Sequence, residues 1–208
     1  MRYSLVIDCT ALAYIGETLN THKAHQTAQK QGNTEGRQVQ KKHTMTQLNN
    51  EHKAYIAGFL DGDGCLNAQI VPRHDYKLHY QIRVTLTFFQ KTKRHWILLQ
   101  LQKLLKLGTI RKRNDGMSEY AIVGKDSVKK CLHLLYPYIK LKKVHARRVL
   151  QIISQLHKNQ DPQTFLKVCE VVDTFEHLND SKKRTMTSKV VCSHFVALNL
   201  LPVPVETI

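Results

Sequence analysis

The chain lacks several patterns that define common classes of protein. It has no run of eighteen apolar residues, so no segment is expected to cross a membrane as a helix. It has no Cys-x-x-Cys and no His-Glu-x-x-His pattern, which argues against a zinc site. The apolar stretch of residues 3–15 is interrupted by Asp8, so a secretion signal is not expected.

Cysteines are few and irregularly spaced. There are five in 208 residues, an odd number, and they lie far apart in the sequence. This pattern is typical of reduced thiols in an intracellular compartment rather than of a disulfide framework.

Acidic residues are scarce relative to basic ones. The sequence has 16 Asp and Glu against 32 Lys and Arg, which gives a formal net charge of +16 at pH 7. Each Lys or Arg that meets a phosphate releases a condensed counterion, so this balance favours a polyanionic partner. A charge that serves only solubility is the alternative, but acidic residues serve solubility equally well.

The order of the patterned segments predicts an α+β protein with an antiparallel sheet. Residues 1–47 are expected to form a flexible polar leader, residues 48–200 the folded domain and residues 201–208 a short tail. On the helix expected at 143–155, Val144 and Val149 should face inward. The expected helices are 52–61, 93–105, 126–136, 143–155, one starting at Pro162, and 188–199; the expected strands are 65–73, 80–90, 109–113 and 118–123.

Residues 55–64 carry the most information. Gly58 and Gly62 lie four residues apart on one face of a helix, where a missing Cβ lets another helix approach closely. Each glycine costs a helix roughly 1 kcal/mol relative to alanine, so two of them indicate close helix packing. Asp61 and Asp63 then fall at the helix end, where hard carboxylate oxygens beside DNA phosphates would suit Mg²⁺.

This segment allows two other interpretations. A helix end followed by a chance Gly-Asp turn is the simpler one. A calcium loop is excluded because Cys65 stands where a third oxygen ligand belongs, Leu66 where glycine is required, and Pro72 where a bidentate glutamate should be.

Residues 56–64 are similar to the nine-residue LAGLIDADG signature. Further landmarks extend the similarity from about residue 52 to about residue 195, so the chain resembles the single-motif homing endonucleases encoded in organellar group I introns. The resemblance implies an αββαββα fold with a concave antiparallel sheet and additional C-terminal helices. The matching positions are Ala57, Gly58, Asp61, Asp63 and Gly64, then 68–70, 90–92, Trp96, Pro137, 140–142 and 178–182.

The resemblance also implies a role for individual residues. Asp63 would bind the metal, Mg²⁺ with Mn²⁺ able to substitute, and Gly62 would offer its backbone carbonyl. Gln90 would orient solvent, while Arg94 and Lys142 would stabilise the charge that develops on the scissile phosphate. For the two cations, plain phosphate contact is the alternative.

The strands would present one polar face to the DNA major groove, as they do in the family. Arg73, Arg83, Arg111 and Arg113 are expected on this face with only Glu119 opposing them, a density of cations that favours DNA over solvent alone. The expected DNA contacts are Asn67, Gln69, Val71, Arg73, Tyr76, Gln81, Arg83, Thr85, Thr87, Arg111, Arg113, Glu119, Ala121 and Lys140.

One motif supplies one half-site, so we expect a homodimer that cuts double-stranded DNA at a long pseudo-palindromic target. Its expected interface consists of Ala57, Gly58, Asp61 and Gly62. An intron RNA maturase and a non-catalytic DNA-binding protein stay open as alternatives on the same fold. The resemblance implies an organellar location, in a plastid rather than a mitochondrion.

Overall fold

The computed structural model describes residues 48–157, 160–179 and 184–202, all of which belong to the unit Thr44–Ile208. The expected leader, residues 1–47, lies outside the described residues. A four-stranded antiparallel sheet in the order β1-β2-β4-β3 is built from β1 (Gly64–Pro72), β2 (Tyr80–Lys91), β3 (Thr109–Lys112) and β4 (Met117–Val123).

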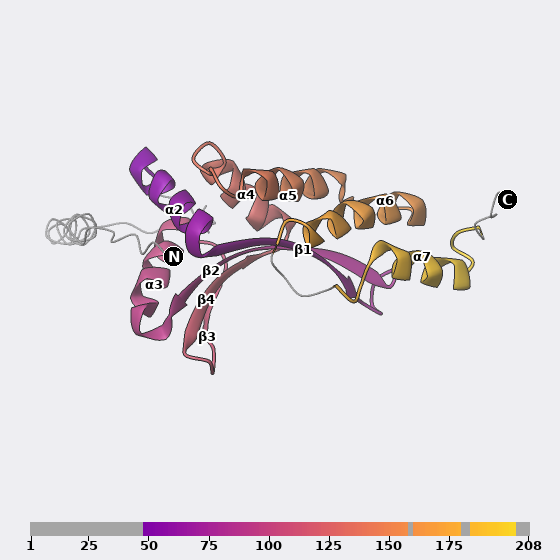
Figure 1. Cartoon of the computed structure of the whole chain (residues 1–208). Helices are drawn as coiled ribbons and strands as arrows, with labels where there is room; N and C mark the ends of the chain where they lie inside the picture. The colour runs from indigo at the N-terminus through magenta and orange to yellow at the C-terminus, as the bar shows by residue number, and fades with distance from the viewer. Residues whose placement is uncertain (1–47, 158–159, 180–183, 203–208) are drawn as a thin grey trace, which may run out of the picture. The chain divides into compact units, whose positions relative to one another are not determined.

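Helices cover one face of this sheet. They are α2 (Asn50–Asp63), α3 (His95–Leu105), α4 (Lys125–Leu135), α5 (Lys143–Gln155), α6 (Pro162–Asp173) and α7 (Ser188–Ala197), with short 3₁₀ turns η2 (Thr92–Arg94) and η3 (Thr174–Glu176). Figure 1 shows α4, α5 and α6 along the convex side of the curved sheet, while its concave side has no helix across its middle. The expected order of helices and strands is confirmed.

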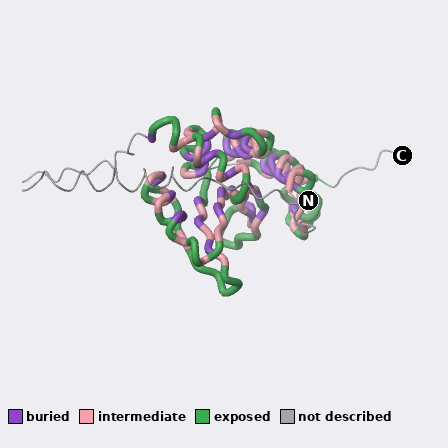
Figure 2. The backbone as a smooth tube through the Cα atoms, turned by 60° about the vertical axis from the view of Figure 1, so that its left-hand side comes forward, coloured by how far each residue is buried: buried purple, intermediate pink, exposed green. Residues whose placement is uncertain are grey.

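The strands show why the sheet has two different faces. Apolar side chains of Leu66, Val84, Leu86 and Tyr120 are buried against the helices, while the residues between them are partly exposed (Figure 2). The Tyr120 hydroxyl donates to the Leu107 carbonyl at 2.6 Å, which satisfies the one polar atom of a fully buried ring. Alternation with a period of two therefore leaves one continuous face for a partner.

The helix ends match their local sequences. Asp161 caps α6 by accepting the Thr164 N–H at 2.9 Å, and Pro162 occupies the first turn, where its missing N–H costs nothing. On α5, Val149 is buried as expected, but Val144 is 44% exposed, contrary to expectation. Val144 lies in the first turn of α5, two residues before Ala146, the first buried residue of this helix. Two residues are more than half a turn, so Val144 points away from the side that Ala146 buries. None of the described helices combines the length and apolarity needed to cross a membrane.

Candidate active site and nucleic-acid interface

The motif helix α2 presents two different faces. Ile56, Ala57 and Leu60 are completely buried in the chain's own core. Ala57 is therefore placed inward by the helix rotation, contrary to its expected position in a dimer interface. Gly58 and Gly62 lie on the outer face, where a Cβ added to either would meet nothing within 4 Å. The two glycines are not needed for packing within the described chain, and they leave the outer face of α2 open to a close neighbour.

Gly64 ends α2 and begins β1 for a steric reason. A Cβ at this position would lie 2.6 Å from Leu60 Cδ1 and 2.7 Å from the Leu60 carbonyl oxygen. The amide of Gly64 donates to that same carbonyl, so the chain must pass tightly over the last turn. Only glycine fits between helix and strand here, and this fixes where Asp61 and Asp63 project.

Asp61 organises the turn that precedes α5. Its Oδ2 accepts the backbone N–H groups of Lys140 and Leu141 at 2.7 and 3.1 Å, and its Oδ1 accepts that of Lys142 at 2.9 Å. Lys142 Nζ donates in return to the Asp61 carbonyl oxygen at 2.5 Å. The Asp61 carboxylate, expected at a dimer interface, thus binds the 140–142 turn of its own chain, about eighty residues away in sequence. These bonds fix Lys142 at the end of α2.

Asp63 stands in contrast to Asp61. It is the last residue of α2, it is exposed, and it forms no hydrogen bond or ion pair with the described residues. The C-terminal end of a helix carries partial negative charge, which adds to the attraction of this carboxylate for a cation. An uncommitted carboxylate beside the exposed backbone of Gly62 suits a hard divalent ion.

One chain offers only part of a metal shell. Within the described ranges, no three His, Cys, Asp or Glu side chains gather in a way that could hold an ion. Six or more ligands are usual for such ions, so waters, DNA phosphates or a second chain would have to provide the others. The donor set therefore fits a site that is completed only when DNA is bound.

The strand pairing brings Gln90 to the same end of the sheet. Gly64 pairs with Phe88, so the end of α2 lies beside the last residues of β2. Gln90 pairs with the buried Ser118, and its Oε1 accepts the Lys91 N–H at 3.0 Å. Arg94 ends the η2 turn that follows, is exposed, and has no ionic partner among the residues that the structure describes.

The register aligns the expected DNA-contacting residues in rows across the concave face. Each pair joins two residues that lie opposite each other on neighbouring strands. The pairs are Asn67 with Thr85, Gln69 with Arg83, Val71 with Gln81, Thr87 with Ala121, and Arg111 with Glu119. These side chains are exposed or half-buried, so the expected polar face is present as one continuous surface.

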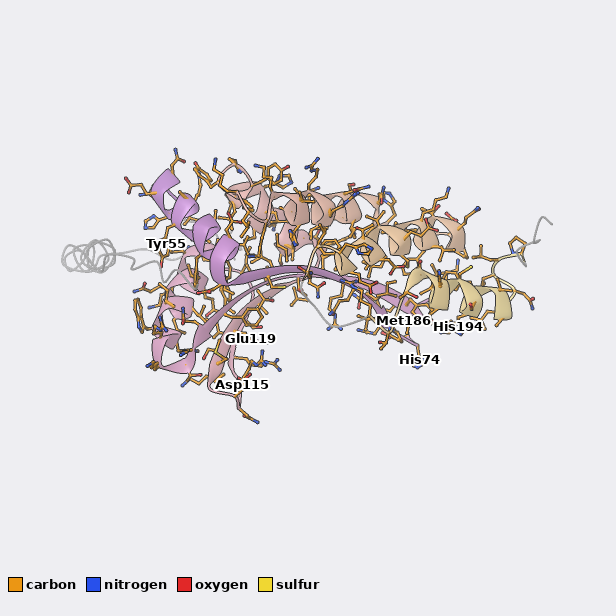
Figure 3. All side chains as sticks on the ribbon, viewed as in Figure 1. Tyr55, His74, Asp115, Glu119, Met186 and His194 are labelled. Carbon is orange, nitrogen blue, oxygen red and sulfur yellow. The ribbon has the colours of Figure 1, made fainter. Side chains whose placement is uncertain are left out.

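The charges on this face are more balanced than expected. Glu119 Oε1 lies 2.8 Å from Arg111 Nε and its other oxygen 3.9 Å from Arg113. Asp115 pairs with Arg113 at 2.7 Å, and Asp75 with Arg73 at 2.7 Å. The expectation that Glu119 alone opposes these cations was wrong, because the turns that follow β1 and β3 fold their own aspartates back. Figure 3 shows Glu119 on the concave side and Asp115 further out toward the turn.

Arg83 is the exception. It is exposed, and within the described part of the chain it has no ionic partner. Two other expected contacts lie away from the strand rows: Tyr76 in the β1–β2 turn, with the Arg73 guanidinium 5.1 Å from its ring centre, and Lys140 in the turn held by Asp61. Exposed ion pairs contribute about 0–1 kcal/mol, so the paired arginines can exchange their partners for phosphates at little cost.

The sequence interpretation missed several residues of this surface. By the same alternation, Cys65, Phe89 and Lys91 share the concave face. Burial raises the pKa of the Cys65 thiol, while the nearby Lys142 charge lowers it, which places the thiol close to that cation. The alternation of strand side chains between the two faces could have identified Cys65, Phe89 and Lys91 from the sequence. Arg184, which reaches Asn67, follows no periodic pattern and could not have been found in this way.

An α+β protein with a basic concave sheet and a free carboxylate at the end of a glycine-containing helix is the architecture of an enzyme that acts on nucleic acid. Comparison with known proteins agrees. The LAGLIDADG endonuclease family matches residues 56–153. The DNA endonuclease I-CvuI of Chlorella vulgaris is 51% identical over 138 residues, which cover 66% of this chain and 86% of that protein. The DNA endonuclease I-CreI of Chlamydomonas reinhardtii is 41% identical over 147 residues, 70% and 90% of the two chains.

The fold comparison leads to the same family. A crystal structure of I-CvuI in complex with its target, in the presence of calcium, matches with a TM-score of 0.68 and 48% identity, over 71% of this chain and 94% of that one. The chain belongs to the LAGLIDADG endonuclease family.

Proposed function

We propose that this protein is a site-specific endonuclease that cuts both strands of a long pseudo-palindromic DNA target in the course of intron homing. The observation that carries the proposal is the uncommitted carboxylate of Asp63, next to Lys142 and at the margin of a concave face lined with Arg, Gln, Asn and Thr. The proposal is supported by the similarity to I-CvuI and I-CreI, both named as DNA endonucleases, and by the complex of I-CvuI with its target.

Asp63 and the Gly62 carbonyl would hold a divalent ion, Mg²⁺ with Mn²⁺ able to replace it. When bound, the ion would lower the pKa of an attacking water and neutralise phosphate charge. Lys142, fixed by Asp61, would donate to a phosphate oxygen. Arg94, the last residue of the η2 turn, would donate to the phosphate as well. Gln90, half-buried at the end of β2, would orient solvent through its amide. These roles need no general base among the side chains.

The active form would be a homodimer. Gly58 and Gly62 leave the outer face of α2 without side chains, so a twofold copy of the helix can approach to backbone contact. Each chain would then contribute one Asp63 near the axis and one concave face to half of the target. This arrangement would cut two nearby phosphates on opposite strands.

The concave face would read the DNA in the major groove. Arg and Gln side chains can make paired hydrogen bonds to guanine and adenine, and Thr and Asn can make single ones. The rows built on Gln69, Arg83 and Gln81 would serve this role, with Tyr76 and Arg73 reaching the outer base pairs.

Residues 48–200 would form the endonuclease domain, preceded by the leader 1–47 and followed by the tail 201–208. An organellar location, plastid rather than mitochondrial, is supported by relatives from Chlorella and Chlamydomonas.

Plasmid cleavage tests the proposal. A library of candidate pseudo-palindromic sites from organellar ribosomal-RNA genes would be incubated with the protein and Mg²⁺, with EDTA in a parallel sample. Asp63→Asn is expected to abolish cutting and keep binding. The matched control is Asp126→Asn, which changes an exposed aspartate at the start of α4 and is expected to cut normally. Tight binding without cutting in either Mg²⁺ or Mn²⁺ would favour a non-catalytic DNA-binding protein, and tighter binding of intron RNA a maturase.

A further inference from the structure

Strand β1 lies at the edge of the sheet, and residues from the C-terminal part of the chain cover its free side. Two carbonyls spaced by two residues face outward from this edge. Asn179 Nδ2 donates to the Leu66 carbonyl at 3.3 Å, and Arg184 Nη1 donates to the Ala68 carbonyl at 2.8 Å. An uncovered edge would invite pairing with another chain, so these contacts have a structural use of their own.

Arg184 does more than cover the edge. Its Nη1 also donates to the Val172 carbonyl at 3.2 Å, and its guanidinium carbon lies 6.0 Å from the centre of the Phe175 ring. Its Nη2 extends to the concave side and donates to Asn67 Oδ1 at 3.0 Å. The planar guanidinium is therefore fixed by backbone on one side while its other nitrogen holds a side chain of the DNA-facing surface.

The contact determines which way the Asn67 amide points. A guanidinium can only donate hydrogen bonds, so the Asn67 atom that faces it must be the oxygen. The Nδ2 group is then directed away from Arg184, and it makes no hydrogen bond with the residues that the structure describes. Asn67 pairs with Thr85 on the concave face, two residues before Gln69, so its free Nδ2 belongs to the row that would meet base edges.

We propose that Arg184 is a positioning residue that sets base specificity: by holding Oδ1 at the β1 edge it presents the Nδ2 donors of Asn67 to the major groove, which selects guanine over adenine at the base pair that Asn67 reads. The inference rests on the proposed function, because it needs DNA on the concave face. A free asparagine recognises adenine by accepting from N6 and donating to N7. With the oxygen held, the two N–H groups of Nδ2 match the N7 and O6 acceptors of guanine, while they oppose the N6 amine of adenine.

The test is a binding selection with the full chain. Double-stranded DNA with a randomised half-site would be selected in Ca²⁺, and relative affinities would be read at every position. Asn67→Ala identifies the base pair that Asn67 reads, because the preference at that position should vanish. At that base pair the wild type is expected to favour guanine over adenine roughly ten-fold. Arg184→Met should reduce this ratio to within about two-fold and leave the other positions unchanged.

Two controls separate specificity from edge covering. Asn179→Ala removes the neighbouring edge contact without touching Asn67, so its base profile should equal that of the wild type. In the double variant Asn67→Ala with Arg184→Met, the profile should equal that of Asn67→Ala alone. If Arg184→Met fails to unfold cooperatively, Arg184→Lys replaces it. A lysine ammonium cannot donate at once to the Ala68 carbonyl, the Val172 carbonyl and Asn67 Oδ1, as the planar guanidinium does. A guanine-to-adenine ratio lowered at least about three-fold in Arg184→Lys supports the proposal.

Other outcomes would overturn it. An unchanged guanine-to-adenine ratio in Arg184→Met, or in Arg184→Lys where that variant is used, would mean that Arg184 only covers the strand edge. A wild type that prefers adenine at this base pair, or an Asn67→Ala profile identical to that of the wild type, would also contradict the inference while leaving the endonuclease intact. If the wild type bound no DNA sequence above background, the proposed function itself would fail.

Discussion

The Asp61 carboxylate accepts a hydrogen bond from the backbone N–H of Lys142 at 2.9 Å, and the Lys142 ammonium group donates one to the Asp61 backbone carbonyl at 2.5 Å. The pair joins the end of α2 to the start of α5, so the acidic end of the motif and the basic turn are held as one unit. Asp63, two residues beyond Asp61, makes no bond to the described residues and is available for a metal.

Removing the Asp61 carboxylate tests this link. Asp61→Ala leaves three backbone N–H groups without their acceptor, and we expect the free energy of unfolding to fall by about 1–2 kcal/mol, as for the loss of a helix cap. Because Lys142 would lose its support, DNA cleavage should fall more than DNA affinity. Urea unfolding, single-turnover cleavage and equilibrium binding would measure the three quantities. Glu51→Gln, an exposed acidic residue at the other end of α2, is the control; equal cleavage by Asp61→Ala and wild type would contradict the assigned role.

The glycines of the motif should respond in opposite ways to alanine. At Gly64 a Cβ would approach the Leu60 backbone to 2.7 Å, so Gly64→Ala should lower stability by roughly 1–3 kcal/mol. At Gly58 a Cβ meets none of the described residues within 4 Å, so Gly58→Ala should raise helix stability by about 0.5–1 kcal/mol at concentrations where the chain is monomeric. Urea unfolding of the two variants in parallel checks both predictions. A loss of stability in monomeric Gly58→Ala would contradict the open environment of this position.

A bulky residue at Gly58 tests the dimer separately. Gly58→Leu should leave the chain folded, because the outer face of α2 is open, but it should prevent a second α2 from approaching closely. Sedimentation at micromolar concentration is expected to show a dimer for the wild type and a monomer for the variant. A matched substitution is Ala54→Leu, one turn earlier on the same exposed face, which would show how far the contact extends along α2. Persistence of the dimer in Gly58→Leu would place its interface elsewhere.

Glu119 should restrain binding to DNA in general. Its carboxylate, 16% exposed, engages Arg111 and Arg113. Glu119→Gln keeps the shape and frees the Arg111 guanidinium, while Arg113 keeps its pair with Asp115. We therefore expect tighter binding to all sequences, weaker discrimination among them, and a slope of log affinity against log salt that is steeper by about one unit. Binding titrations on specific and random DNA at several salt concentrations would measure this. Glu170→Gln, on the exposed side of α6, is the control and should leave the slope unchanged. An unchanged slope in Glu119→Gln would mean that the freed Arg111 does not meet a phosphate.

Two buried thiols should make the free energy of unfolding depend on pH above about pH 9. Burial raises the pKa of Cys131 to about 12 and also raises that of Cys169, against an ordinary value of 9.0. Below pH 9 both thiols are protonated whether the chain is folded or not, so their contribution is fully present. Above pH 9 only the unfolded chain loses these protons, and the free energy of unfolding should fall as the pH rises toward the native values. Urea unfolding at pH 8, 9, 10 and 11 should show a shallower decline for Cys131→Ala than for the wild type.

Alkylation offers an independent measurement of the same thiols. In native protein at pH 8.5, iodoacetamide should label Cys131 and Cys169 slowly, because both are buried and their thiolates are disfavoured. In 6 M urea both should react at the rate of a free cysteine. Mass spectrometry of digests gives the rate at each residue, and rapid native labelling of either thiol would contradict the burial that the structure shows.

The order of elements and the polar face of the sheet could be predicted from the sequence because both depend on local periodicity. Residues 80–88 alternate strictly, so their strand and its two faces follow from period two. Asp161 before Pro162 is a local helix start, and the structure contains the expected cap. The motif at 56–64 indicated the family for the same reason, since its residues are contiguous.

What local patterns could not supply is how each helix is rotated and which distant residues it meets. The glycine spacing did not reveal that Ala57 faces the core while Gly58 faces out, because that choice depends on where the sheet lies against α2. The spacing also could not show that Asp61 would bind a turn some eighty residues away, leaving Asp63 free.

The sequence by itself thus determined the class of fold, the basic face and the position of the motif, because each depends on neighbours in the chain. Only the tertiary structure decided that Asp61 binds the 140–142 turn, which arginines are already paired, and that Arg184 holds Asn67. Hydrogen bonds and ion pairs act over about 3–4 Å, so their partners are known only when segments far apart in sequence have been brought to that distance.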